Sequence, residues 1–210
     1  MTVFMKNRVF TLSNIAALIS YSATYAAGFL LSLYLQHIKG LSPMGAGTIL
    51  VSQPIVQALI SPLAGKASDR IEPRLVASTG MAVTAAGLFF LAFIEATTPM
   101  WLIVGNLFLL GLGFALFSSP NTNAIMSSIE TKFYGVASSM LSTMRLLGQM
   151  FSMGIAMLLF AVYMGKVEIV PVYYPLLMKS VRTAFLVFGF MSAAGIYASF
   201  ARGNMRISSD

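Results

Sequence analysis

The residues that could do chemistry in this chain are few and widely spaced. The 210 residues include six acids, one His and no Cys. The acids all lie outside the long apolar runs: Asp69, Glu72, Glu95, Glu130, Glu168 and Asp210. Aspartyl proteolysis needs two buried acids and serine chemistry needs a buried base, and without Cys there is no thiolate metal site. We therefore expect a protein that is not an enzyme and that uses no metal or cofactor.

Arg145 is the one charged residue inside an apolar run. It follows Gly135 by ten residues, which is about 15 Å along a helix. An unpaired charge at that depth costs several kcal/mol, so the guanidinium is expected to face protein or water. Gln149, four residues later, shares its helix face. Three alternatives stay open: a cavity charge, an anchor for Glu130 or for a partner bundle, and snorkelling towards the headgroups.

Uncharged polar residues mark a candidate wall of a substrate cavity. They form three pairs: Tyr21 with Tyr25, Gln53 with Gln57, and Asn121 with Asn123. The Tyr pair and the Gln pair are each spaced by one helical turn, and Pro54 and Pro120 permit kinks beside the Gln and Asn pairs. Aromatic surfaces with few directional hydrogen bonds suit large amphipathic small molecules.

The densest charge cluster is GKASDRIEPR, residues 65–74. Gly65 permits a turn or close packing, and Arg70 and Arg74 supply cations that could pair with the carboxylate of Asp69 or with a helix C-terminus. One hypothesis is a gating latch whose ion pairs form in one tilt of the helices and break in another. The simpler interpretation is a short basic loop beside a membrane.

These residues must be positioned by membrane-spanning helices. Charged residues make up 9% of the chain and hydrophobic residues 58%, whereas soluble domains carry roughly 25% charged residues. Runs near 20 residues without strict alternation favour helices over barrel strands. Six such runs follow one another: about 10–36, 44–64, 75–94, 100–125, 136–164 and 184–200. The sequence predicts an all-α integral membrane protein, a six-transmembrane-helix bundle that forms a single domain over residues 1–210.

Basic residues predict how the bundle faces. If the chain starts in the cytoplasm, eight bases lie on the inner side: Lys6, Arg8, Lys66, Arg70, Arg74, Lys132, Arg202 and Arg206. Four lie outside: Lys39, Lys166, Lys179 and Arg182. The positive-inside rule then places both termini in the cytoplasm. We assign the net charge of +7 to contact with a lipid bilayer, of the plasma or inner membrane, and not to nucleic acid. The outer segment 166–182, broken by prolines, is expected to be too short to span.

Residues 65–74 resemble the loop signature of the major facilitator superfamily, G-x-L-A-D-R-x-G-R-K. Gly65, Asp69 and Arg70 are in register, and Arg74 falls where the final base is expected. The other positions are degenerate, as in the copy that this superfamily carries in its carboxy-terminal half. Residues 10–47 and 111–149 are also similar to the carboxy-terminal half of multidrug proton antiporters with fourteen spans. The resemblance implies one half of a major facilitator fold, efflux of amphipathic drugs, and an arginine at the position of Arg145.

The resemblance also implies a missing partner. The superfamily works with two six-helix bundles that rock around a central cavity, and this chain has runs for one. It is expected to need an amino-terminal six-helix bundle or a second copy of itself, and a truncated reading frame, a split transporter and a half-size homodimer all stay open. Because no acid lies inside a run, a coupling carboxylate is expected on the partner. The alternative is a non-transporting six-helix membrane protein, either a truncated remnant or an interaction or regulatory subunit.

Overall fold

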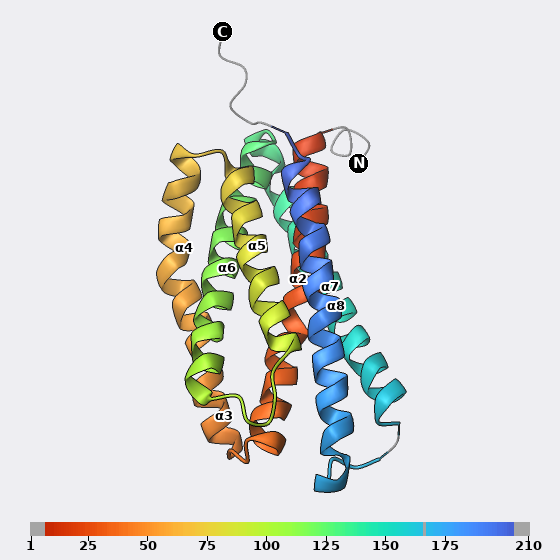
Figure 1. Cartoon of the computed structure of the whole chain (residues 1–210). Helices are drawn as coiled ribbons and strands as arrows, with labels where there is room; N and C mark the ends of the chain where they lie inside the picture. The colour runs from red at the N-terminus through yellow and green to blue at the C-terminus, as the bar shows by residue number, and fades with distance from the viewer. Residues whose placement is uncertain (1–6, 166, 204–210) are drawn as a thin grey trace.

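The computed structural model describes residues 7–165 and 167–203, which form helices and no strands. Six helical segments in this part of the chain are long and apolar enough to cross a membrane, and they stand side by side as one bundle (Figure 1). In chain order they are α2 Arg8–Leu33 with the π-helical η1 Tyr34–Ile38, α3 Pro43–Leu50 with α4 Ser52–Arg70, α5 Pro73–Ala92, α6 Met100–Ser127, α7 Tyr134–Tyr163 and α8 Tyr174–Phe200. Short 3-10 turns, η2 Thr131–Phe133 and η3 Pro171–Tyr173, precede α7 and α8. The predicted fold class is confirmed.

The helices are arranged so that α4 and α7 lie at the two edges of the bundle. Contacts between neighbours run in the order α4, α6, α5, α8, α2 and α7, and α2 also contacts α6. The start of α2 and the end of α8 lie at the same end of the bundle (Figure 1), which we call the terminal end. The connections from α4 to α5 and from α6 to α7 lie at this end too, because each helix reverses the chain direction.

The two edge helices are the least covered. Of the most apolar 18-residue window in each segment, 6% is buried in α3–α4 and 17% in α7, against 39–61% in the other four. Leu59 on α4 and Met150 on α7 are among the large apolar side chains left exposed. These two helices therefore present apolar surface to lipid or to another protein.

Close helix packing holds the centre of the bundle together. A Cβ atom added to Gly80 on α5 would lie 2.6 Å from the Gly113 carbonyl oxygen on α6, so glycine is required at this crossing. Buried apolar side chains form two clusters. One includes Leu30, Leu91 and Phe185, and the other, nearer the terminal end, includes Phe10 and Phe117.

The second helix is longer than predicted. The expected run ended at residue 64, but α4 continues to Arg70, so most of the charge cluster is helical. The Ser68 hydroxyl donates to the Gly65 carbonyl (2.7 Å) within this last part. The helix stops at Ile71, which is extended, and Pro73 occupies the first turn of α5. Charged side chains at a helix end can reach the headgroup layer without disturbing the helix. The length of the apolar run therefore underestimates the length of the helix.

The last helix begins ten residues earlier than predicted, at Tyr174 and not at 184. The outer segment 166–182 was expected to be broken by prolines throughout, but residues 174–182 are helical. Pro175 lies in the first turn of α8, where a helix has no need of the missing N–H. Lys179 and Arg182 therefore belong to the helix, and the Arg182 Nε donates to the Ala92 carbonyl at the end of α5 (3.0 Å).

Candidate functional site

A pocket near the middle of the bundle is lined by five of the helices. We call it the central pocket; its cavity volume is about 460 Å³. The lining residues are Tyr21, Thr24, Tyr25 and Gly28 of α2, Leu50 of α3, Gln53, Pro54 and Gln57 of α4, Phe114 of α6, and Gln149 of α7. The pocket therefore reaches from one edge helix to the other.

Four of the six predicted cavity residues come together here. Tyr21, Tyr25, Gln53 and Gln57 line the pocket together, and so does Gln149, which was expected to share a helix face with Arg145. Sequence reasoning missed Phe114 of α6, whose ring meets the Tyr21 ring edge-on at 5.4 Å between centroids. A single Phe in an apolar run carries no signal that separates it from lipid-facing or core aromatics.

The chemistry of the central pocket is aromatic and amide-like. Three glutamines supply both donors and acceptors, and three aromatic rings supply flat apolar surface. Among the described residues that line it, none is Asp, Glu, Lys or Arg. Such a lining can bind a ring-containing molecule with a few polar groups, and it offers no fixed charge to pair with an ion.

Arg145 stands beside the pocket and contacts its wall. The guanidinium carbon lies 5.0 Å from the centroid of the Tyr21 ring, and the side chain is half-buried. Its Nε is buried and has no hydrogen-bond partner. Glu130, one of the anchors considered for Arg145, instead pairs with Lys132 at 2.6 Å on the exposed surface. The arginine is thus directed at α2, where a cation over an aromatic face is favourable.

Tight packing of α7 on α2 sets this geometry. A Cβ atom added to Gly148 would lie 2.7 Å from the Leu18 carbonyl oxygen and 2.8 Å from the Tyr21 Cβ. One turn further, the Ser152 hydroxyl accepts a hydrogen bond from the Ala26 backbone N–H (2.9 Å). Small side chains four residues apart let the two backbones approach, which brings Arg145 and Gln149 against α2.

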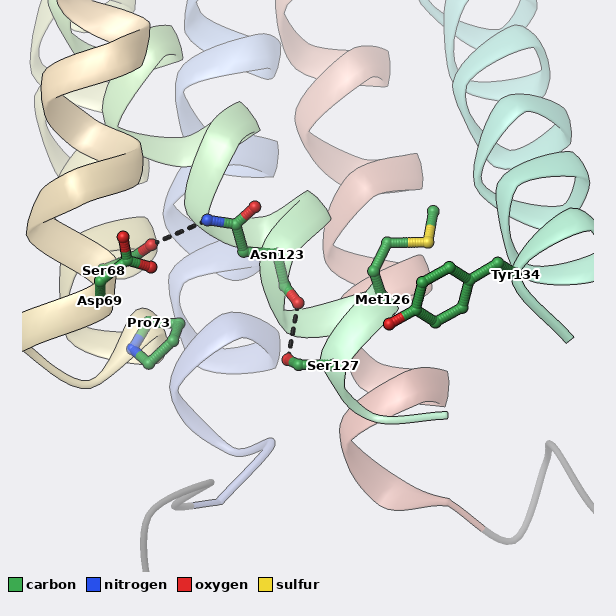
Figure 2. A pocket seen from close by; sticks show the side chains of 7 residues that line it. All are labelled: Ser68, Asp69, Pro73, Asn123, Met126, Ser127 and Tyr134. Atoms are coloured by element: carbon green, nitrogen blue, oxygen red, sulfur yellow. Dashed lines mark hydrogen bonds between the residues drawn. The ribbon is translucent and has the colours of Figure 1, made fainter. Parts of the chain in front are cut away.

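The charge cluster forms part of a second pocket, at the terminal end. Figure 2 shows Ser68 and Asp69 at the end of α4 facing Asn123 of α6, with Tyr134 across from them at the start of α7. The cavity volume is about 530 Å³, and Pro73, Met126 and Ser127 complete the lining. The Asn123 amide donates to the Ser68 hydroxyl (3.1 Å). Asp69 therefore lines a pocket whose walls come from α4, α5, α6 and α7.

The remaining residues of the cluster fasten helices to one another. A Cβ atom added to Gly65 would lie 3.0 Å from the Ser119 hydroxyl, so α4 runs close to α6 at this point. Arg74, in the first turn of α5, lies over the Phe200 ring at 5.1 Å. Asp69 and Arg70 sit on α4 and Arg74 on α5, so a change of tilt between these helices would alter their separations, as the latch hypothesis requires.

Asn121 and Asn123 do not line the central pocket, so their place in a substrate cavity stays a prediction. Residues two apart on a helix are turned by about 200° from one another, so they face opposite sides of α6. Asn123 reaches Ser68 at the terminal-end pocket. Asn121 is buried in the opposite direction, where its amide donates to the Ser13 carbonyl (3.1 Å) and its oxygen accepts from Arg202 (2.9 Å).

Arg202, one of the bases that the sequence assigned to the inner side, is buried. Its side chain is 1% exposed, and its burial was not predicted. No group of three potential metal ligands occurs among residues 7–165 and 167–203.

Six helical segments long and apolar enough to cross a membrane define a polytopic integral membrane protein. Residues 14–205 match the Major Facilitator Superfamily, and the chain belongs to this superfamily of membrane transporters. The resemblance seen in residues 65–74 is thereby confirmed at the level of the superfamily.

Three individual transport or resistance proteins are similar in sequence to this chain. The chain is 35% identical over 151 residues to the riboflavin transporter RibZ of Clostridioides difficile, covering 72% of this chain and 33% of RibZ. It is 37% identical over 141 residues to the uncharacterized transporter YebQ of Escherichia coli (67% of this chain, 31% of YebQ). The lincomycin resistance protein LmrB of Listeria monocytogenes is 29% identical over 140 residues, covering 67% of this chain and 30% of LmrB. The matched part of this chain spans about a third of the length of these relatives.

Proposed function

We propose that this chain is the carboxy-terminal six-helix half of a drug-efflux antiporter with fourteen spans. It moves amphipathic small molecules across the plasma or inner membrane together with a second six-helix bundle. The observation that carries this proposal is the central pocket, whose lining reaches from α4 to α7. Those are the two helices with the largest uncovered apolar surface. A second bundle placed against both edges would enclose the pocket and provide the opposite wall.

The lining points to the class of substrate. Tyr21, Tyr25 and Phe114 suit flat rings, and Gln53, Gln57 and Gln149 suit a few amide, hydroxyl or ether groups. A panel of candidate substrates should include riboflavin and lincomycin, because the names of two relatives, a riboflavin transporter and a lincomycin resistance protein, refer to these molecules. An uncharged lining favours neutral or weakly charged amphiphiles over small ions.

Proton coupling in this antiporter draws on a carboxylate of the second bundle. Asp69 lies in the last turn of α4, and Glu72, Glu95, Glu130 and Glu168 lie in connections or caps. Asp210 lies outside the described residues. The central pocket thus has no acid to carry a proton. Drug-coupled proton flux driven by this chain alone in vesicles would contradict this assignment.

We further propose that the terminal end faces the cytoplasm. Six described bases lie at that end: Arg8, Lys66, Arg70, Arg74, Lys132 and Arg202. Three lie towards the opposite end: Lys39, Lys179 and Arg182. The chain has no Cys, so a single cysteine at Arg8 or at Glu95 reports the side directly. A membrane-impermeant thiol reagent added outside intact cells should label only the cysteine at Glu95, and the reverse pattern would invert the orientation.

The pocket is tested by binding. Gln53→Leu should weaken binding of a fluorescent amphipathic dye about fivefold, since a lost hydrogen bond is worth about 1 kcal/mol. Gln36→Leu is the matched control, because the Gln36 amide donates a hydrogen bond to the Ser32 hydroxyl of α2 and Gln36 does not line the pocket. Equal affinity of the wild type and Gln53→Leu would remove this pocket as the binding site. A chain that neither binds nor moves any member of the panel, with or without a second bundle, would favour the alternative of a non-transporting interaction subunit or remnant.

A further inference from the structure

Arg202 lies just after the last helix, and its side chain is buried in the bundle. It follows α8 by two residues, and Gly203 has a φ of +88°, which lets the chain leave the helix in a left-handed turn. The side chain is buried to 1% exposure and is the largest fully buried side chain among the described residues. A cation at the very end of a helix would ordinarily reach into the headgroup layer, so its burial calls for a physical account.

The guanidinium of Arg202 joins three helices other than its own. Its Nη1 donates to the Ser13 hydroxyl of α2 (3.1 Å) and to the Asn121 side-chain oxygen of α6 (2.9 Å). Its Nη2 donates to the Pro73 carbonyl at the start of α5 (2.8 Å). The Asn121 amide in turn donates to the Ser13 carbonyl (3.1 Å). We call Arg202, Ser13, Asn121 and Pro73 the Arg202 cluster.

Two members of the Arg202 cluster, Ser13 and Asn121, lie on helices that also line the central pocket. Ser13 precedes Tyr21 by eight residues on α2, which is about 12 Å along the helix. Asn121 follows Phe114 by seven residues on α6, or about 10 Å. Tyr21 and Phe114 are the pair whose rings meet at the pocket. The relative tilt of α2 and α6 is therefore fixed by a ring contact at the pocket and by hydrogen bonds at the terminal end.

Pro120 makes this position on α6 susceptible to bending. A proline inside a helix removes one backbone hydrogen bond and is a common cause of kinks. Pro120 is buried and directly precedes Asn121, the residue that Arg202 and Ser13 both contact. A directional contact next to the weakened turn sets the direction of α6 beyond it.

Stability alone does not explain a buried arginine. Burial lowers the pKa of Arg202 to about 10, the Glu72 carboxylate opposes this shift, and the Arg74 cation adds to it. The Arg202 Nε is buried without a hydrogen-bond partner. A well-packed apolar side chain often stabilises such a site as well as a buried charge does. What the guanidinium provides, and an apolar side chain does not, is a planar fork with directed donors.

We propose that Arg202 is a positioning residue that fixes the terminal-end separation of α2 and α6, and through it the relative tilt of these two helices during transport. The role in transport rests on the proposed function. The separation itself can be measured in this chain alone, so the two claims can fail independently.

Spin labels on an Arg8→Cys, Ser127→Cys double variant measure this separation, since both side chains are exposed and lie at the terminal ends of α2 and α6. In the wild-type background, a single narrow distance distribution is expected. Arg202→Met should broaden or shift it by more than about 3 Å, because a tilt of about 5° moves the end of a 40 Å helix by that amount. Ser13→Ala, which removes one of the three contacts and is expected to leave the fold intact, should give a smaller change of the same kind.

Tyr34→Phe is the matched control. It removes a partly buried hydrogen bond, from the Tyr34 hydroxyl to the Glu95 carbonyl (2.7 Å), just beyond the far end of α2, and it should leave the distribution unchanged. An unchanged distribution in both Arg202→Met and Ser13→Ala would overturn the proposal, as would an equal change in Tyr34→Phe. In an assembled transporter, Arg202→Met should lower the maximal rate while the KM stays within about twofold, because Arg202 does not line the pocket; an equal loss through KM would also overturn it.

Discussion

Arg145 and Tyr21 form the contact that joins α7 to the wall of the central pocket: the guanidinium carbon lies 5.0 Å from the ring centroid. The same ring meets Phe114 of α6 edge-on. Tyr21 is therefore in contact with side chains from α6 and from α7, two of the helices that pack against α2.

A double-mutant cycle tests this contact. Arg145→Met and Tyr21→Leu should be coupled by about 1 kcal/mol in the free energy of unfolding in detergent, since a partly desolvated cation over a ring contributes that much. Arg145→Met and Tyr25→Leu form the control cycle, because Tyr25 is 50% exposed and lies one turn away in the same pocket. Additive effects in the first cycle would show that the stacking carries no energy.

Gly148 should tolerate no side chain. A Cβ added here would lie 2.7 Å from the backbone oxygen of Leu18 and 2.8 Å from the Cβ of Tyr21. Neither atom can move aside by rotation of a side chain. Gly148→Ala should therefore lower the free energy of unfolding by about 1 to 3 kcal/mol. Gly154→Ala on the same helix is the control, since nothing lies within 4 Å of its added Cβ; it should be neutral or stabilising. Equal effects of the two substitutions would argue against the close approach of α7 to α2.

The charge on Arg202 should produce no pH dependence near neutrality. Burial lowers its pKa from the ordinary value of an arginine to about 10, so the folded state is penalised while the group is protonated. That penalty is relieved only as pH rises above about 10. Between about pH 6 and pH 8, the difference in unfolding free energy between wild type and Arg202→Met should stay constant. A difference that changes by more than about 0.5 kcal/mol across this range would mean that another group titrates with Arg202.

The uncovered edges of the bundle should drive self-association of the isolated chain. A single cysteine at Leu59, which is 69% exposed on α4, should form disulfide-linked dimers under mild oxidation in detergent. A cysteine at Tyr197, 80% exposed on α8, is the control and should not. A clean monomer by light scattering, with no cross-linking at Leu59, would show that these faces contact only lipid.

The sequence predicted the parts of the fold that depend on composition. Six apolar runs became six helices because the backbone in lipid must satisfy its own hydrogen bonds. The errors lay at helix ends. Charged residues up to Arg70 extended α4, and Pro175 began α8 where a break had been expected.

The candidate site was predictable only where spacing determines direction. Tyr21 and Tyr25, and Gln53 and Gln57, are one turn apart and reach the same pocket. Asn121 and Asn123 are two apart, so one faces Arg202 and the other Ser68. Arg202 could not be placed from the sequence, because its partners Ser13 and Asn121 are far away in the chain and small polar residues are common in membrane helices.

Transport in vesicles tests the central claim most directly. This chain should be reconstituted alone and together with the remaining portion of the riboflavin transporter RibZ, the part that the match does not cover. Movement of a fluorescent amphipathic dye is then followed. We expect dye transport when this chain is combined with that part of RibZ, with a marked loss in Arg145→Leu at unchanged membrane insertion. No dye transport in either preparation, or transport that Arg145→Leu and Gln53→Leu leave unaltered, would contradict it.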